Sequence, residues 1–218
     1  MKKILRFLTD LKGNNNREWF QANKGQYQEA LDRFRNVTGK VISGIRALDP
    51  ELPDMEAKDC IFRIYRDVRF SADKSPYKTH FGAIISEGGR KMAFAGYYFH
   101  IEPGASIIGG GIYRPESPIL KKVRKDIFEN PEEFEAIISN KGFLATFGGL
   151  QGEKLKNPPR GYPQKASSIE WLKYKSYTVF KNYTDKEVCA PDFLDNVIDG
   201  FSKMIPMIHF LNYAIREE

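Results

Sequence analysis

The chain has 218 residues, of which 41% are hydrophobic and 13% aromatic, and its formal net charge is +6. This length and apolar content allow a sizeable buried core and exclude a largely disordered chain. The apolar residues near the N-terminus are interrupted by Arg6 and Asp10, and no apolar run approaches the ~20 residues of a membrane span, so we expect neither a signal peptide nor a membrane partner.

The first fifty residues have the spacing of amphipathic helices. Apolar residues over 4–11 predict a short helix that ends at Gly13. Asn15 and Glu18 then form a capping-box pattern at the start of a longer helical stretch, which continues to about residue 49 as one helix or as two. We interpret these helices as packing elements.

Residues 59–82 are the most unusual part of the chain, because five cations and only two carboxylates lie between positions 63 and 78. Alternation over 62–70 predicts a strand with one apolar and one cationic face, which bends or ends near Arg66. Residues 73–78 have turn chemistry, since Pro76 keeps the preceding residue out of helical conformation. We therefore expect a strand that delivers guanidinium groups to a lysine-bearing loop.

Short strands and then further helices are predicted after this region. The expected strands are 81–86, 92–102, 106–113 and 175–182. The expected helices are 117–127, 131–138 and 191–211, the last with a kink at Pro206. Tight turns between the strands favour an antiparallel meander. The sequence thus predicts a single α+β domain over residues 1–218, with an antiparallel sheet packed against N-terminal and C-terminal helices.

Cationic side chains of the central stretch are the first candidate site. The candidate ligand-binding residues there are Arg63, Arg66, Arg69, Lys74, Tyr77 and Lys78. The planar fork of arginine matches carboxylate or phosphate oxygens, and lysine adds a mobile charge. The alternative is that Asp67, Asp73 and other acids neutralise these cations in structural ion pairs.

Two further arginines are candidates for the same site. Arg17 lies near the start of the second helical stretch, and Arg114 follows the triplet at 109–111 and precedes a predicted helix. Backbone amides at such a junction can hold a phosphate. Three glycines in a strand are also typical of a bulge or of close backbone approach, so both interpretations stay open.

His100 and Glu102 are candidate catalytic residues, because they lie two apart on a predicted strand and so share one face with Tyr98. A histidine that titrates near neutrality can exchange protons, and Asp67 is a third candidate for proton transfer. The alternative is a solvated polar sheet face. We expect no metal site, because no cysteine and no second histidine lies at ligand spacing, and no motif names a cofactor.

Cys60 and Cys189 are the two cysteines of the chain. Two cysteines cannot form a disulfide framework, and a reducing compartment is the default for such a protein. We therefore expect a cytoplasmic location.

Several strings along the chain resemble the DUF2461 family of conserved hypothetical bacterial and fungal proteins. They include residues 7–20, 62–70, 73–79, 98–101, 111–115 and 161–162. The resemblance spans almost the whole chain and is most specific in the arginine-rich string. It implies no particular reaction, because the family has no established activity.

Three functions are compatible with these patterns. The first is a cationic pocket for a small phosphorylated or carboxylated ligand, in a binding protein or an enzyme. The second is a nucleic-acid-binding module, whose positive surface would include Lys121, Lys122, Arg124 and Lys125. The third is a structural or interaction protein whose arginines form internal ion pairs. The sequence favours the first and leaves the ligand, the reaction and the oligomeric state open.

Overall fold

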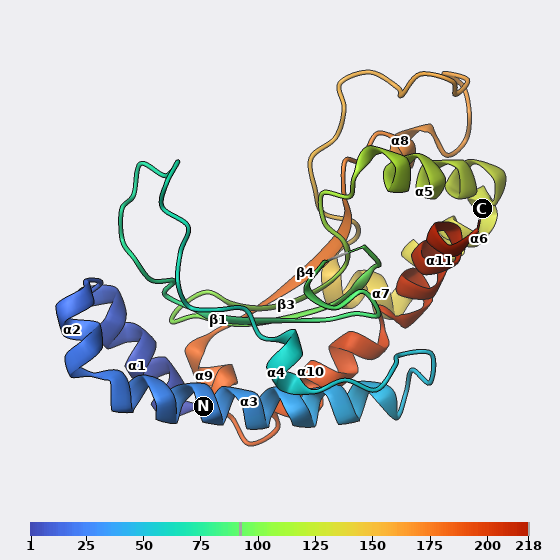
Figure 1. Cartoon of the computed structure of the whole chain (residues 1–218). Helices are drawn as coiled ribbons and strands as arrows, with labels where there is room; N and C mark the ends of the chain where they lie inside the picture. Colours follow the sequence, from blue (N-terminus) through green and yellow to red (C-terminus); the bar gives the residue numbers. More distant parts are fainter. Residues whose placement is uncertain (92, 218) are drawn as a thin grey trace.

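A four-stranded antiparallel sheet forms the centre of the computed structural model, which describes residues 1–91 and 93–217 (Figure 1). The strands lie in chain order and are β1 (Phe81–Ile85), β2 (Gly96–Ile101), β3 (Ser106–Ile112) and β4 (Tyr177–Tyr183). The predicted α+β fold with an antiparallel sheet is confirmed. Met92, where we expected the second strand to begin, lies outside the described residues.

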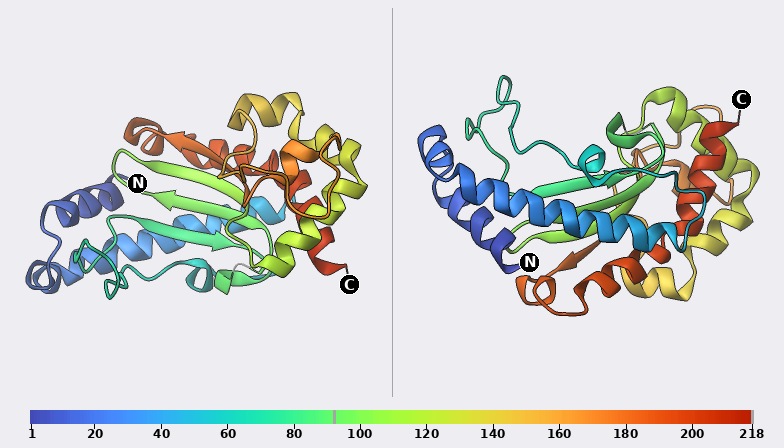
Figure 2. Two further views of the ribbon diagram at one scale, coloured as in Figure 1. Left: turned by 90° about the horizontal axis from the view of Figure 1, so that it is seen from above. Right: turned by 60° about the horizontal axis from the view of Figure 1, so that its bottom comes forward.

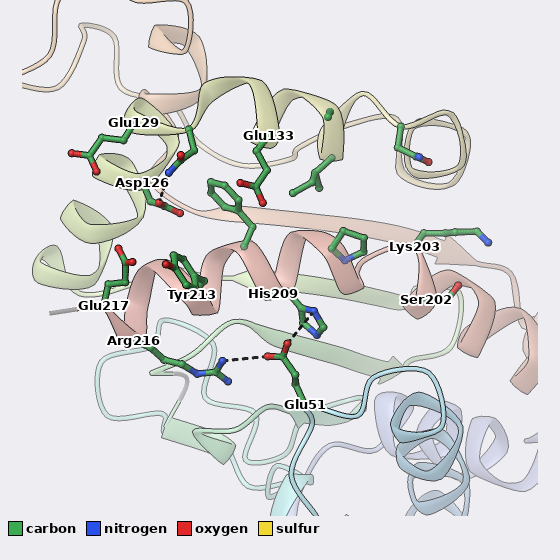
Figure 3. Close-up of a pocket in the computed structure, with 16 residues that line it drawn as sticks. Glu51, Asp126, Glu129, Glu133, Ser202, Lys203, His209, Tyr213, Arg216 and Glu217 are labelled. Carbon is green, nitrogen blue, oxygen red and sulfur yellow. Dashed lines mark hydrogen bonds and ion pairs between the residues drawn. The ribbon is translucent and has the colours of Figure 1, made fainter.

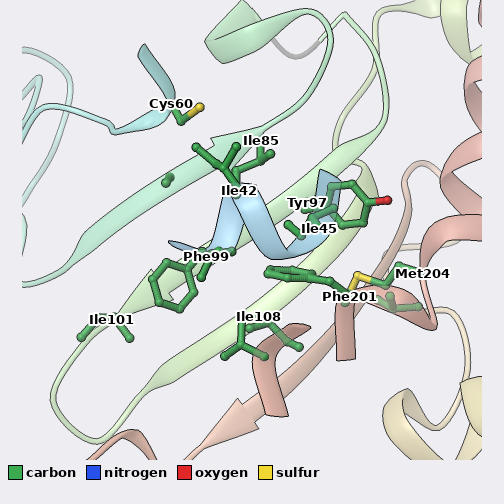
Figure 4. Packing of buried hydrophobic residues seen from close by; sticks show 14 of the residues in the cluster. Ile42, Ile45, Cys60, Ile85, Tyr97, Phe99, Ile101, Ile108, Phe201 and Met204 are labelled. Atoms are coloured by element: carbon green, nitrogen blue, oxygen red, sulfur yellow. The ribbon is translucent and has the colours of Figure 1, made fainter. Parts of the chain in front are cut away.

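Helices from both ends of the chain cover one face of the sheet. The N-terminal helices are α1 (Lys2–Gly13), α2 (Arg17–Ala22), α3 (Lys24–Arg46) and α4 (Ala57–Cys60), and the C-terminal ones are α9 (Asp185–Val188), α10 (Phe193–Ser202) and α11 (Ile205–Arg216). Figure 2 shows α3 lying along this face. Alternate strand residues such as Ala83, Tyr97 and Phe99 point into the core between sheet and helices. There they meet Ile42 and Ile45 of α3 and, from the C-terminal side, Phe201 and Met204 (Figure 4).

The opposite face of the sheet, which we call the open face, has no helix of the described chain lying across it (Figure 1). Gly82 of β1, Tyr98 and His100 of β2 and Phe180 of β4 belong to this face, because they alternate with the core residues. On one side of it rises the segment of residues 62–80, and on the other side rise α5 (Ser117–Glu129), α8 (Ile169–Leu172) and the loop around residues 148–168. The helices α6 (Pro131–Ile138) and α7 (Lys141–Phe147) continue from α5.

Several predicted boundaries were wrong, for local reasons. The long N-terminal helical stretch divides at Asn23, which ends α2 and precedes α3. The cap of α2 is Asn16, whose side chain accepts from the amide of Trp19, rather than Asn15. Pro206 does not kink a helix but lies in the first turn of α11, where its missing amide hydrogen costs nothing.

No helix among the described residues is both long enough and apolar enough to cross a bilayer.

Candidate functional site

Residues 62–80 form an irregular hairpin instead of the predicted strand, and we call this segment loop 62–80. The Arg66 amide donates to Pro76 at 3.0 Å and the Lys78 amide donates to Ile64 at 2.8 Å, but no regular ladder forms. Pro76 offers no amide hydrogen, so the ladder is interrupted there. The predicted apolar face was also wrong, because Ile64 is buried whereas Phe70 is 95% exposed.

Two of the three arginines in loop 62–80 are held by carboxylates of the same loop. Arg66 pairs with Asp73, and Arg69 binds Asp67 through two bonds, at 2.9 Å from Nε and 2.7 Å from a terminal nitrogen. Hydrogen bonds from Ser75, together with Arg66, lower the pKa of Asp73 to about 2. Arg69 also lowers the pKa of Asp67, which is exposed in the loop and has no bond to His100 or Glu102. The structure therefore does not bring Asp67 together with the other candidate catalytic residues.

Other predicted ligand-binding residues in and near this loop have structural roles or lie apart. The Lys74 ammonium donates to the carbonyl of Val68 at 3.0 Å. The Tyr77 ring is buried and stacks on Phe20 with centroids 4.0 Å apart. Arg17 is exposed at the start of α2.

Lys78 and Arg63 are the cations of loop 62–80 that remain available to a ligand. Within the described residues neither makes an ion pair or a side-chain hydrogen bond. The Lys78 ammonium lies 5.4 Å from the centroid of the Phe62 ring, and its pKa is lowered by burial and by the charge of Arg63. A half-buried ammonium beside a second cation gains from an anion that enters the space next to it.

Tyr98, His100 and Glu102 form one hydrogen-bonded chain along the open face, as their shared face in the sequence predicted. His100 Nδ1 lies 2.8 Å from the Tyr98 hydroxyl, and Nε2 lies 3.1 Å from Glu102 Oε2. Thr79 donates to the other oxygen of Glu102 at 2.7 Å. Because an ionised carboxylate only accepts, Nε2 holds the ring proton and Tyr98 donates to Nδ1. The Tyr98 oxygen can therefore accept a hydrogen bond from a bound ligand.

His80 is a functional candidate that the sequence analysis missed. Its ring stacks on that of His100 with centroids 4.3 Å apart. Burial, together with the neighbouring His100, lowers the pKa of His80 to about 4, and burial also lowers the pKa of His100. Local spacing in the sequence does not point to it, because the contact depends on the pairing of Gly82 with His100, which places the residues just before β1 beside His100.

A hollow of about 540 Å³ lies on the open face beside this chain of side chains. Its walls include Phe62, Ile84, Tyr98, Tyr113 and Phe180. Glycines on the strands leave room for two of these rings. A Cβ at Gly109 would lie 2.5 Å from the Phe180 ring, and one at Gly82 would lie 2.9 Å from the Tyr98 hydroxyl. The glycine triplet of β3 thus lets side chains and backbone of the neighbouring strand β4 lie close to it.

The remaining predicted cations lie outside loop 62–80, and one of them, Arg114, stands beside a ring that lines the hollow. The Arg114 guanidinium stands 5.3 Å from the centroid of the Tyr113 ring and lowers the pKa of Glu153, after the larger effect of Lys175. On α5, Lys122 donates to the carbonyls of Ile215 and Glu217, and Arg124 donates to that of Tyr174. Lys125 pairs with Glu129 at 3.9 Å. Lys122 and Arg124 thus fasten neighbouring segments together, and Lys125 pairs within its own helix. Among the described residues, the Arg114 side chain makes no hydrogen bond or ion pair.

A larger hollow, of about 1180 Å³, lies between α11 and the pair α5–α6 (Figure 3). Carboxylates dominate its charged lining, with Asp126, Glu129, Glu133 and Glu217 against Lys203 and Arg216. None of the predicted site residues lines it. Its negative charge disfavours the anionic ligand that the sequence suggested.

Comparison with known proteins agrees with the resemblance found in the sequence. The family model described as "Conserved hypothetical protein (DUF2461)" matches residues 3–210. No curated protein and no solved structure matches the chain. Since the match covers nearly all of the 218 residues, the chain belongs to the DUF2461 family.

Proposed function

We propose that this protein binds a small ligand with an apolar, ring-like body and a phosphate or carboxylate group, in the hollow on the open face of the sheet. The observation that supports this most directly is the Lys78 ammonium, half-buried and without an ion pair among the described residues, against a ring that lines the hollow. We include a cytoplasmic location in the proposal, which is supported by the free thiols of Cys60 and Cys189.

The lining of the hollow favours an apolar ligand body. Aromatic side chains from three separated parts of the chain, Phe62, Tyr113 and Phe180, face the same space. Aromatic walls bind planar rings by stacking and by burial of apolar surface. The volume of about 540 Å³ lies within the roughly 300–1,000 Å³ that is typical of small-molecule sites.

The cations beside Phe62, one wall of the hollow, favour an anionic group at that end. Lys78 and Arg63 repel each other, and an oxyanion between them would remove that repulsion and raise the lowered pKa of Lys78. Arg66 and Arg69 add little, because Asp73 and Asp67 already neutralise them. The anion site is therefore smaller than the five-cation cluster that the sequence suggested.

A nucleic-acid-binding role has less support than a small ligand. Such binding needs several cations that can release counterions together along one surface. Lys122 and Arg124 instead donate to backbone carbonyls, and Lys125 faces Glu129. The third alternative, structural ion pairs, fits Arg66 and Arg69 but leaves the cations Arg63 and Lys78 without a role.

The test compares ligands that differ only in charge. The melting temperature of the protein is measured with naphthyl phosphate, naphthoate and several nucleoside monophosphates, and with naphthol and the free nucleosides as neutral counterparts. We expect at least one anionic compound to raise the melting temperature and its neutral counterpart to have a much smaller effect.

Two substitutions in loop 62–80 locate the binding. Lys78→Met keeps the apolar stem and removes the ammonium, so the rise in melting temperature caused by the anionic compound should disappear. Arg69→Met removes a cation that Asp67 already neutralises, so the shift should remain. If no anionic compound stabilises the protein, or if both variants lose the shift equally, the proposed site is wrong.

A further inference from the structure

Three side chains at the end of the open face present metal-ligand atoms to one another. His80 precedes β1, His100 lies on β2 and Glu102 follows β2, and one potential ligand atom from each lies within 4.8 Å of the others. We propose that His80, His100 and Glu102 bind a divalent transition-metal ion. This site involves different residues from the cations proposed to hold the anion and goes beyond that function.

The donor set selects the class of metal. Two imidazole nitrogens with one carboxylate suit zinc and ferrous iron, whereas magnesium and calcium prefer oxygen ligands alone. Three protein ligands also leave a coordination position open, as in catalytic metal sites. Each neutral imidazole ring has one nitrogen lone pair to offer, and metal binding is coupled to loss of any second ring proton.

The ring nitrogens of His80 support a ligand role for this residue. Among the described residues, no hydrogen bond or ion pair engages either nitrogen, although the ring is stacked and partly buried. Neither nitrogen is among the fully buried polar atoms that lack a partner, so both keep access to solvent and to an incoming ion. A metal ion could therefore bind His80 without first displacing a protein partner from either nitrogen.

Residues around the three ligands already make the contacts that orient metal ligands. Thr79 donates to one oxygen of Glu102 and leaves the other, Oε2, beside His100 Nε2. The Tyr98 hydroxyl lies 2.8 Å from Nδ1 of His100, opposite the nitrogen that would bind the metal. Once the ring proton lies on Nδ1, its donation to the Tyr98 oxygen would fix the orientation and tautomer of a metal-bound His100.

Metal binding would require a small movement of the ligands. Zinc bonds of about 2.1 Å place tetrahedral ligand atoms roughly 3.4 Å apart, which is closer than the present 4.8 Å limit. His80 lies outside the regular strand and can turn from its stacked position, whereas His100 is fixed by Tyr98 and by its position on β2. With the metal on Nε2, the proton of His100 moves to Nδ1, which then donates to the Tyr98 oxygen.

The direct test uses the full chain and Zn²⁺ as the probe. Protein treated with a chelator and then dialysed is titrated by calorimetry, and bound zinc is counted by elemental analysis. We expect one zinc ion per chain, with no competition from excess Mg²⁺. His80→Gln and Glu102→Gln should each weaken binding by more than about 100-fold, and Thr79→Val should weaken it by about 10-fold.

His209 provides a matched control, because it is the third of the three histidines in the chain and contacts Asp49 on the other side of the sheet. His209→Gln should bind zinc as the wild type does. Circular dichroism and melting in chelator establish that each variant is folded. If His80→Gln does not fold, the Glu102→Gln and Thr79→Val variants still decide the question.

Cobalt and nuclear magnetic resonance identify the ligands. The Co²⁺ protein should show d–d absorption without a thiolate charge-transfer band, and zinc should move the His100 proton from Nε2 to Nδ1 in ¹⁵N spectra. The proposal is overturned if no stoichiometric zinc binds, if His209→Gln is as impaired as His80→Gln, or if a thiolate band places the metal at a cysteine. Stabilisation by an anionic aryl compound should persist in His80→Gln, so the two proposals can fail separately.

Discussion

The side chain of Asn15 bonds to both backbone polar groups of Tyr77. Asn15 Oδ1 accepts from the Tyr77 amide at 3.1 Å, and Nδ2 donates to the Tyr77 carbonyl at 2.9 Å. One amide side chain thus takes the place of a neighbouring strand and attaches loop 62–80 to the turn between α1 and α2. The loop that bears Lys78 therefore depends on a residue 62 positions away in the sequence.

We expect Asn15→Ala to lower the free energy of unfolding by about 1–3 kcal/mol, because it leaves two backbone groups at the buried Tyr77 without partners. Loop 62–80 should also become more sensitive to limited proteolysis. Chemical denaturation and peptide mapping measure the two effects. Asn14→Ala is the control, since Asn14 is exposed and its side chain bonds to Asp10 within the same turn. Equal effects of the two variants would contradict the anchoring role of Asn15.

The alignment of Tyr98, His100 and Glu102 could be predicted from the sequence, because side chains two apart on a strand share a face whatever the strand pairs with. The contact of His80 with His100 could not. It depends on the β1–β2 register, which pairs Gly82 with His100. A shift of that register by one residue would turn every side chain of the strand to the other face of the sheet. Local spacing in the sequence does not determine the register.

In the arginine-rich string, by contrast, the local pattern predicted a face that does not form. Its alternation predicted one cationic face, but a face exists only where a regular strand forms. The side chain of Asn15 takes both backbone groups of Tyr77, and Pro76 has no amide hydrogen, so the segment closes on itself. This closure places Asp73 against Arg66 and leaves Asp67 next to Arg69, so two of the five cations are neutralised within the loop.

Gly111 is the glycine of β3 that we expect to tolerate substitution least. Its φ is +107°, and a Cβ there would lie 2.0 Å from the carbonyl oxygen of Tyr177 on β4. Gly111→Ala should destabilise the fold by on the order of 3 kcal/mol or more, because both the backbone angle and the strand spacing would be strained.

Gly39 provides the matched comparison for this glycine. It lies inside α3, and a Cβ added to it would have no other described part of the protein within 4 Å, its own helix backbone aside. Gly39→Ala should therefore stabilise the protein by about 0.5–1 kcal/mol. Thermal and chemical denaturation of the two variants measure the difference. Near-equal stability of both would show that β3 and β4 can separate slightly at little cost.

Tyr97 and His209 share a buried carboxylate beneath the sheet. The Tyr97 hydroxyl donates to Asp49 at 2.6 Å, and His209 Nε2 lies 2.8 Å from the other oxygen of Asp49, which is 2% exposed. Tyr97→Phe removes one donor from a carboxylate that water cannot easily reach. We expect a loss of about 1–3 kcal/mol by chemical denaturation, whereas Tyr213→Phe, at an exposed position, should change stability by less than about 0.5 kcal/mol.

Asp126 provides the pH-dependent prediction, at the acidic hollow beside α11 (Figure 3). Burial raises the pKa of Asp126, and the charges of Glu217, Glu133 and Glu129 raise it further, against a hydrogen bond from Asn130. The folded state then holds the Asp126 proton more tightly than the unfolded state does. This contribution to stability is present at low pH and is lost as the pH rises through the raised pKa.

Asp126→Asn removes this charge with little change of shape, so we expect it to be more stable than the wild type at neutral pH. The gain should stay below about 1 kcal/mol, because the hollow is open to water and salt. It should disappear as the pH falls below the ordinary range of an aspartate, where the wild-type group is protonated in both states. This difference is measured by melting curves recorded at steps of about one pH unit between about pH 3 and about pH 8. Glu135→Gln, at an exposed position of α6, is the control. A variant less stable than the wild type at neutral pH would mean that the Asp126 carboxylate makes a favourable contact that outweighs the repulsion from its acidic neighbours.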